Sequence, residues 1–175
     1  YALYDQIICI SEKATDELVT YLASDNRVIT VYNGIDIVKF EESSAVERTE
    51  LKGVTADSVI ITMVAGFRKQ KDQDTLIKAM LLLPDTFHLV LVGNGERLEK
   101  CENLAEHLKI KERVHFLGIR NDIPQILKMS DIIVLSSYFE GLSLSSIEGM
   151  ASGRPFVASD VDGLREVVHG AGLLF

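Results

Sequence analysis

The sequence lacks an excess of positive charge. Its 175 residues include 18 lysines and arginines against 26 aspartates and glutamates, which gives a formal net charge of −8. A protein that binds nucleic acid needs a basic face to neutralise phosphates. The composition therefore argues against nucleic acid as the main partner, while a local basic pocket stays open.

Cysteines and long apolar runs are also scarce. The two cysteines, Cys9 and Cys101, lie far apart in or beside apolar segments, which favours buried thiols in a reducing compartment. No apolar run reaches the roughly 18 residues of a membrane-spanning helix, and the N-terminus has no charged signal-peptide start. These absences predict a cytoplasmic location.

What the chain does contain is the composition of a soluble globular domain, with 47% apolar and 25% charged residues. Its length is enough for one domain with a sizeable core. It opens abruptly on "YALYDQIICIS" and stops at the apolar "AGLLF". We therefore expect it to be part of a larger protein, truncated at the C-terminus.

Short β-rich runs alternate with amphipathic, helix-length runs. Most of the β-rich runs are continuously apolar, which is typical of a parallel sheet covered on both faces. The alternation indicates βαβ units and an α/β, Rossmann-like fold with helices on both faces of the sheet. The expected strands are 6–11, 28–32, 58–65, 87–93, 114–118, 131–137 and 155–159, and the expected helices are 12–23, 43–52, 72–82, 95–108, 121–129 and 144–152.

The first elements are set apart from the rest by the polar stretch "EESSAVERTELKG". We expect residues 1–25 to be a hinge at the end of a missing N-terminal domain, and residues 26–175 to form the main domain. In open α/β sheets, ligands bind outside the carboxyl ends of the strands. This rule selects the loops 66–71, 93–95, 118–121, 136–145 and 159–163.

Two glutamates, Glu140 and Glu148, stand with seven residues between them in one of these loops and the helix after it. At helical spacing Glu148 lies at the edge of an apolar stripe, so its carboxylate would face a crevice. The helix N-terminus and the amides of residues 141–143 offer unpaired N–H groups to an anion. The pattern suggests hydroxyl-rich groups at each end and phosphate between them, as in a nucleotide diphosphate sugar.

The alternative for these glutamates is structural. Ser145 and Glu148 have the spacing of a capping box, in which Glu148 would satisfy a backbone N–H. Glu140 could equally be a solvated loop residue. Spacing alone leaves both explanations open.

The stretch "FEGLSLSSIEGMASGRPFVASDVDGLREVV" (139–168) resembles the signature of the retaining GT-B glycosyltransferases of family 4, also called glycosyltransferase group 1. Further segments match in the same order, and together they cover nearly the whole chain. They are "VYNGIDIVKF" (31–40), "VAGFRKQKDQDTLIKAM" (64–80), "LVGNGERLEKCENLAEHL" (91–108), "VHFLGIRNDIPQIL" (114–127) and "SDIIVLSSYFEG" (130–141).

The resemblance implies the C-terminal, donor-binding domain of a two-domain enzyme. Glu140 would contact the donor sugar and Glu148 the ribose hydroxyls. Arg68 and Lys71, with Lys69 as substitute, would stabilise the charge that develops on the diphosphate. We expect catalytic roles for Glu140, Arg68 and Lys71, and donor binding by Glu148, Gly66, Lys69, Ile119, Arg120, Gly141, Leu142, Ser143 and Leu144, with the backbone at Ile119 and Arg120 contacting the base.

The sequence departs from the family pattern at two places. The family has a glycine–arginine pair after the strand that ends near Val64, but here Ala65-Gly66 stands there and an arginine follows only at Arg68. Gly149 occupies a position that is more usually alanine. A helical glycine costs about 1 kcal/mol and allows closer backbone approach, but nothing in the sequence explains its presence.

Other motifs carry less information about function. Gly93 and Gly95 begin like a dinucleotide fingerprint but lack its third glycine, so a tight strand-to-helix turn explains them. The D-x-D pair at 160–162 is expected to be a loop lining the site, and the pair at 72–74 a helix N-terminus. The four histidines have no ligand-like spacing. We expect no metal and no cofactor.

These observations favour a retaining glycosyltransferase that moves a sugar from a nucleotide diphosphate sugar to a carbohydrate or lipid-linked acceptor. Such enzymes often build bacterial surface polysaccharides, so peripheral contact with the cytoplasmic membrane is open. The acceptor would bind through the missing domain, and this fragment alone would be inactive. The alternatives are a non-catalytic nucleotide-sugar-binding module and a GT-B-like sugar epimerase.

Overall fold

The computed structural model describes residues 5–23 and 26–175. Within these ranges, six strands form one parallel sheet in the order β5-β4-β3-β6-β7-β8. The strands are β3 (Val59–Val64), β4 (Phe87–Val92), β5 (Val114–Gly118), β6 (Ile132–Leu135), β7 (Phe156–Ala158) and β8 (Leu173–Leu174). The expected Rossmann-like parallel sheet is therefore confirmed.

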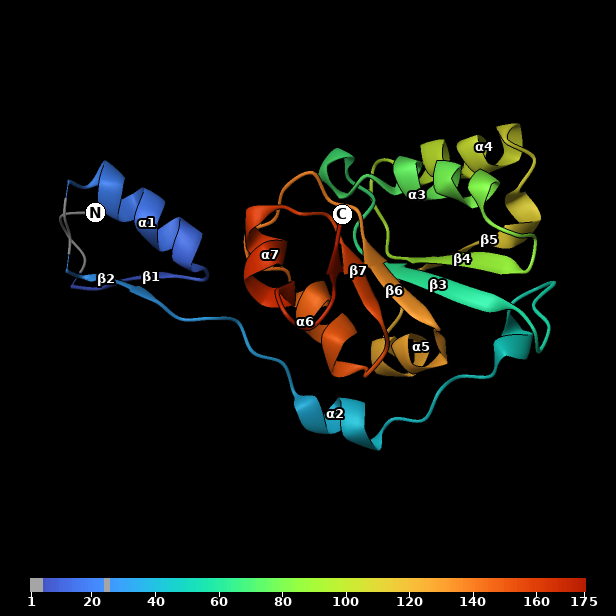
Figure 1. The fold of residues 1–175 in the computed structure, drawn as a ribbon, viewed down its shortest axis with the longest axis horizontal. Helices are drawn as coiled ribbons and strands as arrows, with labels where there is room; N and C mark the ends of the chain where they lie inside the picture. The colour runs from blue at the N-terminus through green and yellow to red at the C-terminus, as the bar shows by residue number, and fades with distance from the viewer. Residues whose placement is uncertain (1–4, 24–25) are drawn as a thin grey trace.

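Helices cover both faces of this sheet, with α3 (Gln73–Ala79) and α4 (Leu98–His107) on one face and α5 (Ile123–Met129) on the other (Figure 1). The central strands are apolar on both sides for this reason. Met63 and Leu91 pack in the cluster that contains Cys101 of α4, while Ile60 and Val90 pack with residues of α5. Two remaining helices, α6 (Leu144–Ala151) and α7 (Asp162–Val168), pack beside β7.

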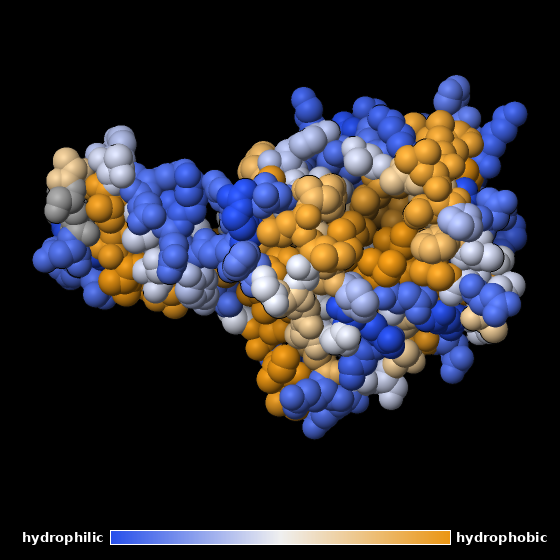
Figure 2. All heavy atoms as spheres, in the orientation of Figure 1, coloured by the Kyte–Doolittle hydropathy of each residue, from blue (hydrophilic) through white to orange (hydrophobic). Residues whose placement is uncertain are grey.

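A smaller N-terminal unit stands beside this domain. It consists of β1 (Ile7–Cys9), α1 (Glu12–Tyr21) and β2 (Val28–Thr30), and its two strands pair only with each other within the described residues. The extended segment 31–36 leads to α2 (Ile37–Glu42), which packs against α5 (Figure 1). Apolar residues gather over the larger unit in Figure 2, whereas hydrophilic residues cover most of the visible face of the N-terminal unit. The boundary that we expected at residue 25 lies outside the described residues.

The predicted helix 43–52 is wrong. The helix lies earlier, in α2, because Phe40 is its buried anchor; residues 43–47 are extended, and the Val46 amide donates to the Gln125 carbonyl. Only a 3₁₀ turn at Arg48–Glu50 follows. Helix α7 and strand β8 were not predicted, and Asp162 begins a helix where we expected a loop.

The chain runs outward from β3 in both directions. It passes through β4 and β5 on one side and then returns to β6, β7 and β8 on the other. The switch point therefore lies between β3 and β6, where loops diverge and leave a crevice at the carboxyl ends. Among the described residues no helix is long and apolar enough to cross a bilayer.

Candidate functional site

An ion pair between Lys71 and Glu140 lies at this switch point. Lys71 follows β3 and Glu140 follows β6, and Lys71 Nζ is 2.5 Å from Glu140 Oε1. The two side chains are only 15% and 6% exposed. The structure thus brings together two residues that the sequence separates by 69 positions. A buried pair of this kind is costly to desolvate, so it is weak evidence for stability and more often serves to fix geometry.

Polar contacts from the end of β6 hold the loop that carries Lys71 and the loop that carries Glu140. The buried hydroxyl of Ser137 donates to Glu140 Oε1 over 2.6 Å, and the buried hydroxyl of Ser136 lies 3.1 Å from the Lys71 carbonyl. The Tyr138 amide donates to the Gln70 carbonyl over 2.8 Å. The two loops therefore form one connected unit. Ser136 and Ser137 were not predicted as site residues. Only their position at the carboxyl end of a strand could have indicated a role.

Glycines allow the loops around the site to approach one another closely. A Cβ atom on Gly93 would lie 2.2 Å from the Ala65 carbonyl oxygen, and one on Gly95 would lie 2.5 Å from that of Phe67. On the other side of the site, a Cβ atom on Gly163 would lie 1.5 Å from the Gly141 oxygen. Gly93 and Gly95 thus serve close approach of two loops, which is more than the tight turn that we expected.

Helix α6 begins at Leu144 with Ser143 as its N-cap, and Ser143 makes no side-chain cap hydrogen bond. Ser145 is therefore inside the helix, and the capping-box explanation of Glu148 is wrong. Across the described part of the chain, the amides of Leu142, Ser143 and Leu144 have no acceptor. These amides, at the positive end of the helix dipole, are suited to an anion.

The buried face of α6 carries small residues. Ser146 and Gly149 are buried, whereas Leu144 of the expected apolar stripe is half exposed. A Cβ atom on Gly149 would lie 2.5 Å from Cε2 of Phe156 in β7. Gly149 is thus explained: it makes room for the Phe156 ring, which brings the helix close to the sheet.

Glu148 lies in the second turn of α6 and is partly buried. Burial raises the pKa of its carboxyl group, because the charged form loses hydration. Its carboxylate makes no hydrogen bond or ion pair with any residue that the structure describes. A half-buried carboxylate without a protein partner is free to accept from a ligand, and the expected place of Glu148 in a crevice stays a prediction.

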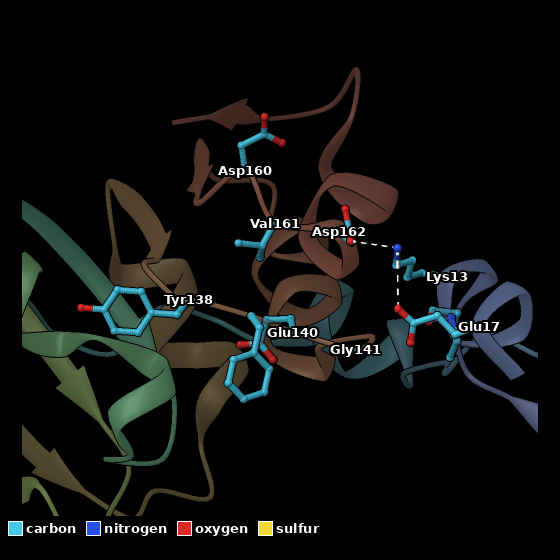
Figure 3. A pocket seen from close by; sticks show the side chains of 11 residues that line it. Lys13, Glu17, Tyr138, Glu140, Gly141, Asp160, Val161 and Asp162 are labelled. Atoms are coloured by element: carbon cyan, nitrogen blue, oxygen red, sulfur yellow. Dashed lines mark hydrogen bonds and ion pairs between the residues drawn. The ribbon is translucent and has the colours of Figure 1, made fainter. Parts of the chain in front are cut away.

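A hollow of about 470 Å³ lies between Glu140 and the N-terminal unit (Figure 3). Lys13 of α1 reaches across it, 3.6 Å from both Asp162 and Glu17. The segment 160–162 also lines this hollow, beside Glu140, and its expected role at the functional site stays a prediction. The other D-x-D pair stands at the N-terminus of α3, as expected, with Asp72 at the N-cap position and Asp74 in the first turn.

A second hollow, of about 480 Å³, contains Arg68 and Lys69. It shares Tyr138 and Phe139 with the first hollow, and these two side chains are 60% and 61% exposed. Arg68 and Lys69 form no ion pair with the residues described. The structure therefore separates two kinds of cation: Lys71 is largely buried and paired with Glu140, while Arg68 and Lys69 are exposed and available.

The predicted base-contacting residues follow β5. The side chain of Ile119 is 75% exposed, and the Arg120 guanidinium forms a bidentate pair with Asp122. The Gly118 carbonyl accepts from the Gly93 amide over 2.8 Å, so this loop lies beside the loop after β4. Gly66 lies in the loop that holds Lys71, and its carbonyl accepts from the buried Gln73 side chain. The roles of these residues stay predictions.

Within the two described ranges, no group of three histidine, cysteine or acidic side chains could hold a metal ion. Asp74 is instead paired with Arg97, 2.8 Å away. Burial raises the pKa of Asp74, but the hydrogen bond and charge of Arg97 outweigh it and leave the pKa lowered.

The sheet with helices on both sides is the C-terminal, Rossmann-like domain of the GT-B glycosyltransferase fold. A structure of HepE from Anabaena in complex with UDP-glucose is 25% identical, with a TM-score of 0.84 over 98% of this chain and 50% of that one. WaaG, a glycosyltransferase involved in lipopolysaccharide biosynthesis, shares the fold with a TM-score of 0.83 over 97% of this chain and 49% of that one, at 21% identity.

The family follows from sequence as well. The model described as "Glycosyl transferases group 1" matches residues 48–174, and the chain belongs to this family. It is 33% identical to the UDP-Gal:alpha-D-GlcNAc-diphosphoundecaprenol alpha-1,3-galactosyltransferase of Escherichia coli, over 91% of this chain and 41% of that protein. The chain thus spans less than half the length of this relative.

Proposed function

We propose that the polypeptide carrying this chain is a retaining glycosyltransferase that uses a nucleotide diphosphate sugar, and that this chain forms its donor-binding domain. The observation that carries the proposal is the Lys71–Glu140 pair at the switch point. It lies in the loops after β3 and β6, and α6 with its unpaired first amides follows the second loop. Cations, amides and a carboxylate gathered at one switch point fit a diphosphate joined to a sugar.

The proposed reaction breaks the bond between the anomeric carbon and the β-phosphate oxygen. Negative charge then develops on the departing nucleotide diphosphate. Lys71 keeps two N–H donors beyond its bond to Glu140, and with Arg68, Lys69 and the α6 amides it would stabilise that charge. The acceptor oxygen attacks from the face that the phosphate leaves, so configuration is retained, and its proton passes to a phosphate oxygen.

The donor is assigned as follows. Glu140 accepts from hydroxyls of the sugar, Glu148 from the ribose, and the backbone at Ile119 and Arg120 contacts the base. We propose a uridine diphosphate sugar, because the HepE structure contains UDP-glucose and the name of the Escherichia coli relative contains UDP-Gal. Side-chain cations balance the diphosphate charge in this proposal, so a metal chelator should leave turnover unchanged.

The acceptor is proposed to be a carbohydrate or a lipid-linked carbohydrate, bound outside this chain, in the synthesis of a surface polysaccharide. The Escherichia coli relative is named for a diphosphoundecaprenol-linked substrate. We place the reaction in the cytoplasm, with peripheral contact to the membrane when the acceptor is lipid-linked. Because the acceptor site lies elsewhere, the chain alone should transfer nothing.

Isothermal titration of this chain with uridine, guanosine and adenosine diphosphate sugars tests the donor assignment. We expect measurable heat with uridine donors and at least tenfold weaker binding of the other two. Equal affinity for all three bases would remove the roles of Ile119 and Arg120, and no binding of any donor would contradict the proposed function.

A further inference from the structure

Glu140 receives two hydrogen bonds, and both end on the same oxygen. Lys71 Nζ and Ser137 Oγ lie 2.5 Å and 2.6 Å from Oε1. The other oxygen, Oε2, accepts from no residue in the described ranges, and Glu140 lines the hollow of Figure 3. The carboxylate is thus held through one oxygen, which leaves the other for a ligand.

The preceding serine holds the partner of Glu140. Ser136 Oγ lies 3.1 Å from the Lys71 carbonyl oxygen and 3.0 Å from that of Asp72, and it can donate its proton to either. Consecutive residues at the end of a strand point in opposite directions. One serine therefore reaches the backbone that carries Lys71, and the next reaches the carboxylate that Lys71 binds.

We propose that Ser137 is a positioning residue for the transfer reaction: it fixes the Glu140 carboxylate so that Oε2 meets the donor sugar, while Ser136 fixes the loop of Lys71. This inference rests on the proposed function. A carboxylate ordered before the donor arrives does not lose rotamer freedom on binding, and a small displacement of such a group lowers the rate. Ser137 acts only through Glu140.

The competing explanation is that the Ser137–Glu140 hydrogen bond only stabilises the turn 137–140, since the two residues are three apart. The two explanations differ in what Ser137→Ala changes. A hydrogen bond that only stabilises the turn contributes to stability and leaves kcat unchanged when it is lost, whereas loss of a positioning residue lowers kcat, and that effect disappears once the Glu140 carboxylate is gone.

The experiment compares Ser137→Ala, Glu140→Ala and the double variant in the full-length polypeptide that carries this chain. We expect Ser137→Ala to lower kcat about 10- to 100-fold, with binding of bare UDP within twofold of wild type, because UDP has no donor sugar. Ser137→Thr keeps the hydroxyl and should restore most of kcat. The double variant should match Glu140→Ala within about twofold.

Ser130→Ala is the matched control. Ser130 is a buried serine just before β6, and its hydroxyl is bonded to Thr62 Oγ1 at 2.6 Å, away from the site. Its loss should lower thermal stability and leave kcat within threefold. A kcat for Ser137→Ala within threefold of wild type would overturn the inference, as would a further fall of kcat when Ser137→Ala is added to Glu140→Ala.

A separate readout distinguishes failure of this inference from failure of the proposed function. If the wild-type protein transfers no sugar from any donor, the proposed function fails and the positioning role is judged from a crystal structure of Ser137→Ala. We expect the Glu140 carboxylate to turn or to occupy more than one rotamer there. A carboxylate unmoved beside Lys71 would show that Ser137 positions nothing.

Discussion

The carboxyl ends of the parallel strands (the carboxyl edge of the sheet) and their amino ends (the amino edge) each carry a hollow and a polar pair. Only the carboxyl edge has the features of a binding site. At the carboxyl edge, the hollow of about 470 Å³ lies beside Lys71 and Glu140. At the amino edge, a hollow of about 510 Å³ lies beside His115, whose Nε2 is 3.0 Å from Nδ1 of His88. Size and burial do not separate the two edges.

The two edges differ in the polar groups that lack a protein partner. At the amino edge, Lys52 pairs with Glu112 at 3.0 Å and Lys111 with Glu106 at 3.3 Å. Burial and the neighbouring His88 lower the pKa of His115 to about 4, so the ring is neutral at pH 7. The carboxyl edge keeps exposed cations, a free carboxylate oxygen and unpaired amides. Such groups are available to a ligand, whereas the two lysines at the amino edge are paired with glutamates.

The largest expected difference between the edges is in catalysis. Glu140→Ala should lower sugar transfer by the full-length polypeptide roughly 100- to 1000-fold, because it removes the proposed contact to the reacting sugar and leaves the largely buried Lys71 without its partner. Glu112→Ala, which breaks an ion pair at the amino edge, is the control and should stay within twofold. Equal turnover of Glu140→Ala and wild type would exclude a catalytic role for Glu140.

The second largest expected effect concerns backbone packing at the carboxyl edge. Gly163→Ala would place a methyl group 1.5 Å from the Gly141 oxygen and should cost about 3 kcal/mol of unfolding free energy. It should also displace the Glu140 loop. Gly34→Ala, where nothing lies within 4 Å, is the control and should change stability little. Denaturant unfolding measures both, and similar midpoints for the two variants would contradict the packing described.

The amino edge should determine part of the pH dependence of stability. The pKa of His115 is depressed to about 4, so between pH 6.5 and 4 only the unfolded chain takes up this proton. Stability from this group is therefore complete above pH 6.5 and is lost as pH falls towards 4, by about 2 kcal/mol after allowance for its partial exposure. His115→Phe should flatten this dependence without altering UDP affinity. An unchanged pH profile would show that His115 titrates normally.

The smallest expected effect concerns Glu148. Because burial raises its pKa, the ionised carboxylate destabilises the free protein, and Glu148→Gln should raise the unfolding free energy at pH 7. The same change should weaken UDP binding about tenfold, through loss of a charged hydrogen bond. Titration calorimetry and denaturant unfolding measure the two effects. Unchanged UDP affinity would remove Glu148 from the ribose site.

The sequence predicted the strands and loops of the carboxyl edge well, because continuously apolar runs identify buried parallel strands. It misplaced α2, where one buried aromatic residue, Phe40, outweighs the helical pattern of 43–52. It named Lys71 and Glu140 but did not predict that they pair, since that contact depends on the order of β3 and β6 in the sheet. Gly149 had no explanation until Phe156 was found against it.

The most direct test is a crystal structure of this chain with UDP bound. We expect the diphosphate between Lys71 and the first amides of α6, the ribose hydroxyls against Glu148, and the base beside Ile119. A diphosphate at the amino edge near His115, or one bound at the carboxyl edge without contact to Lys71 or α6, would contradict it.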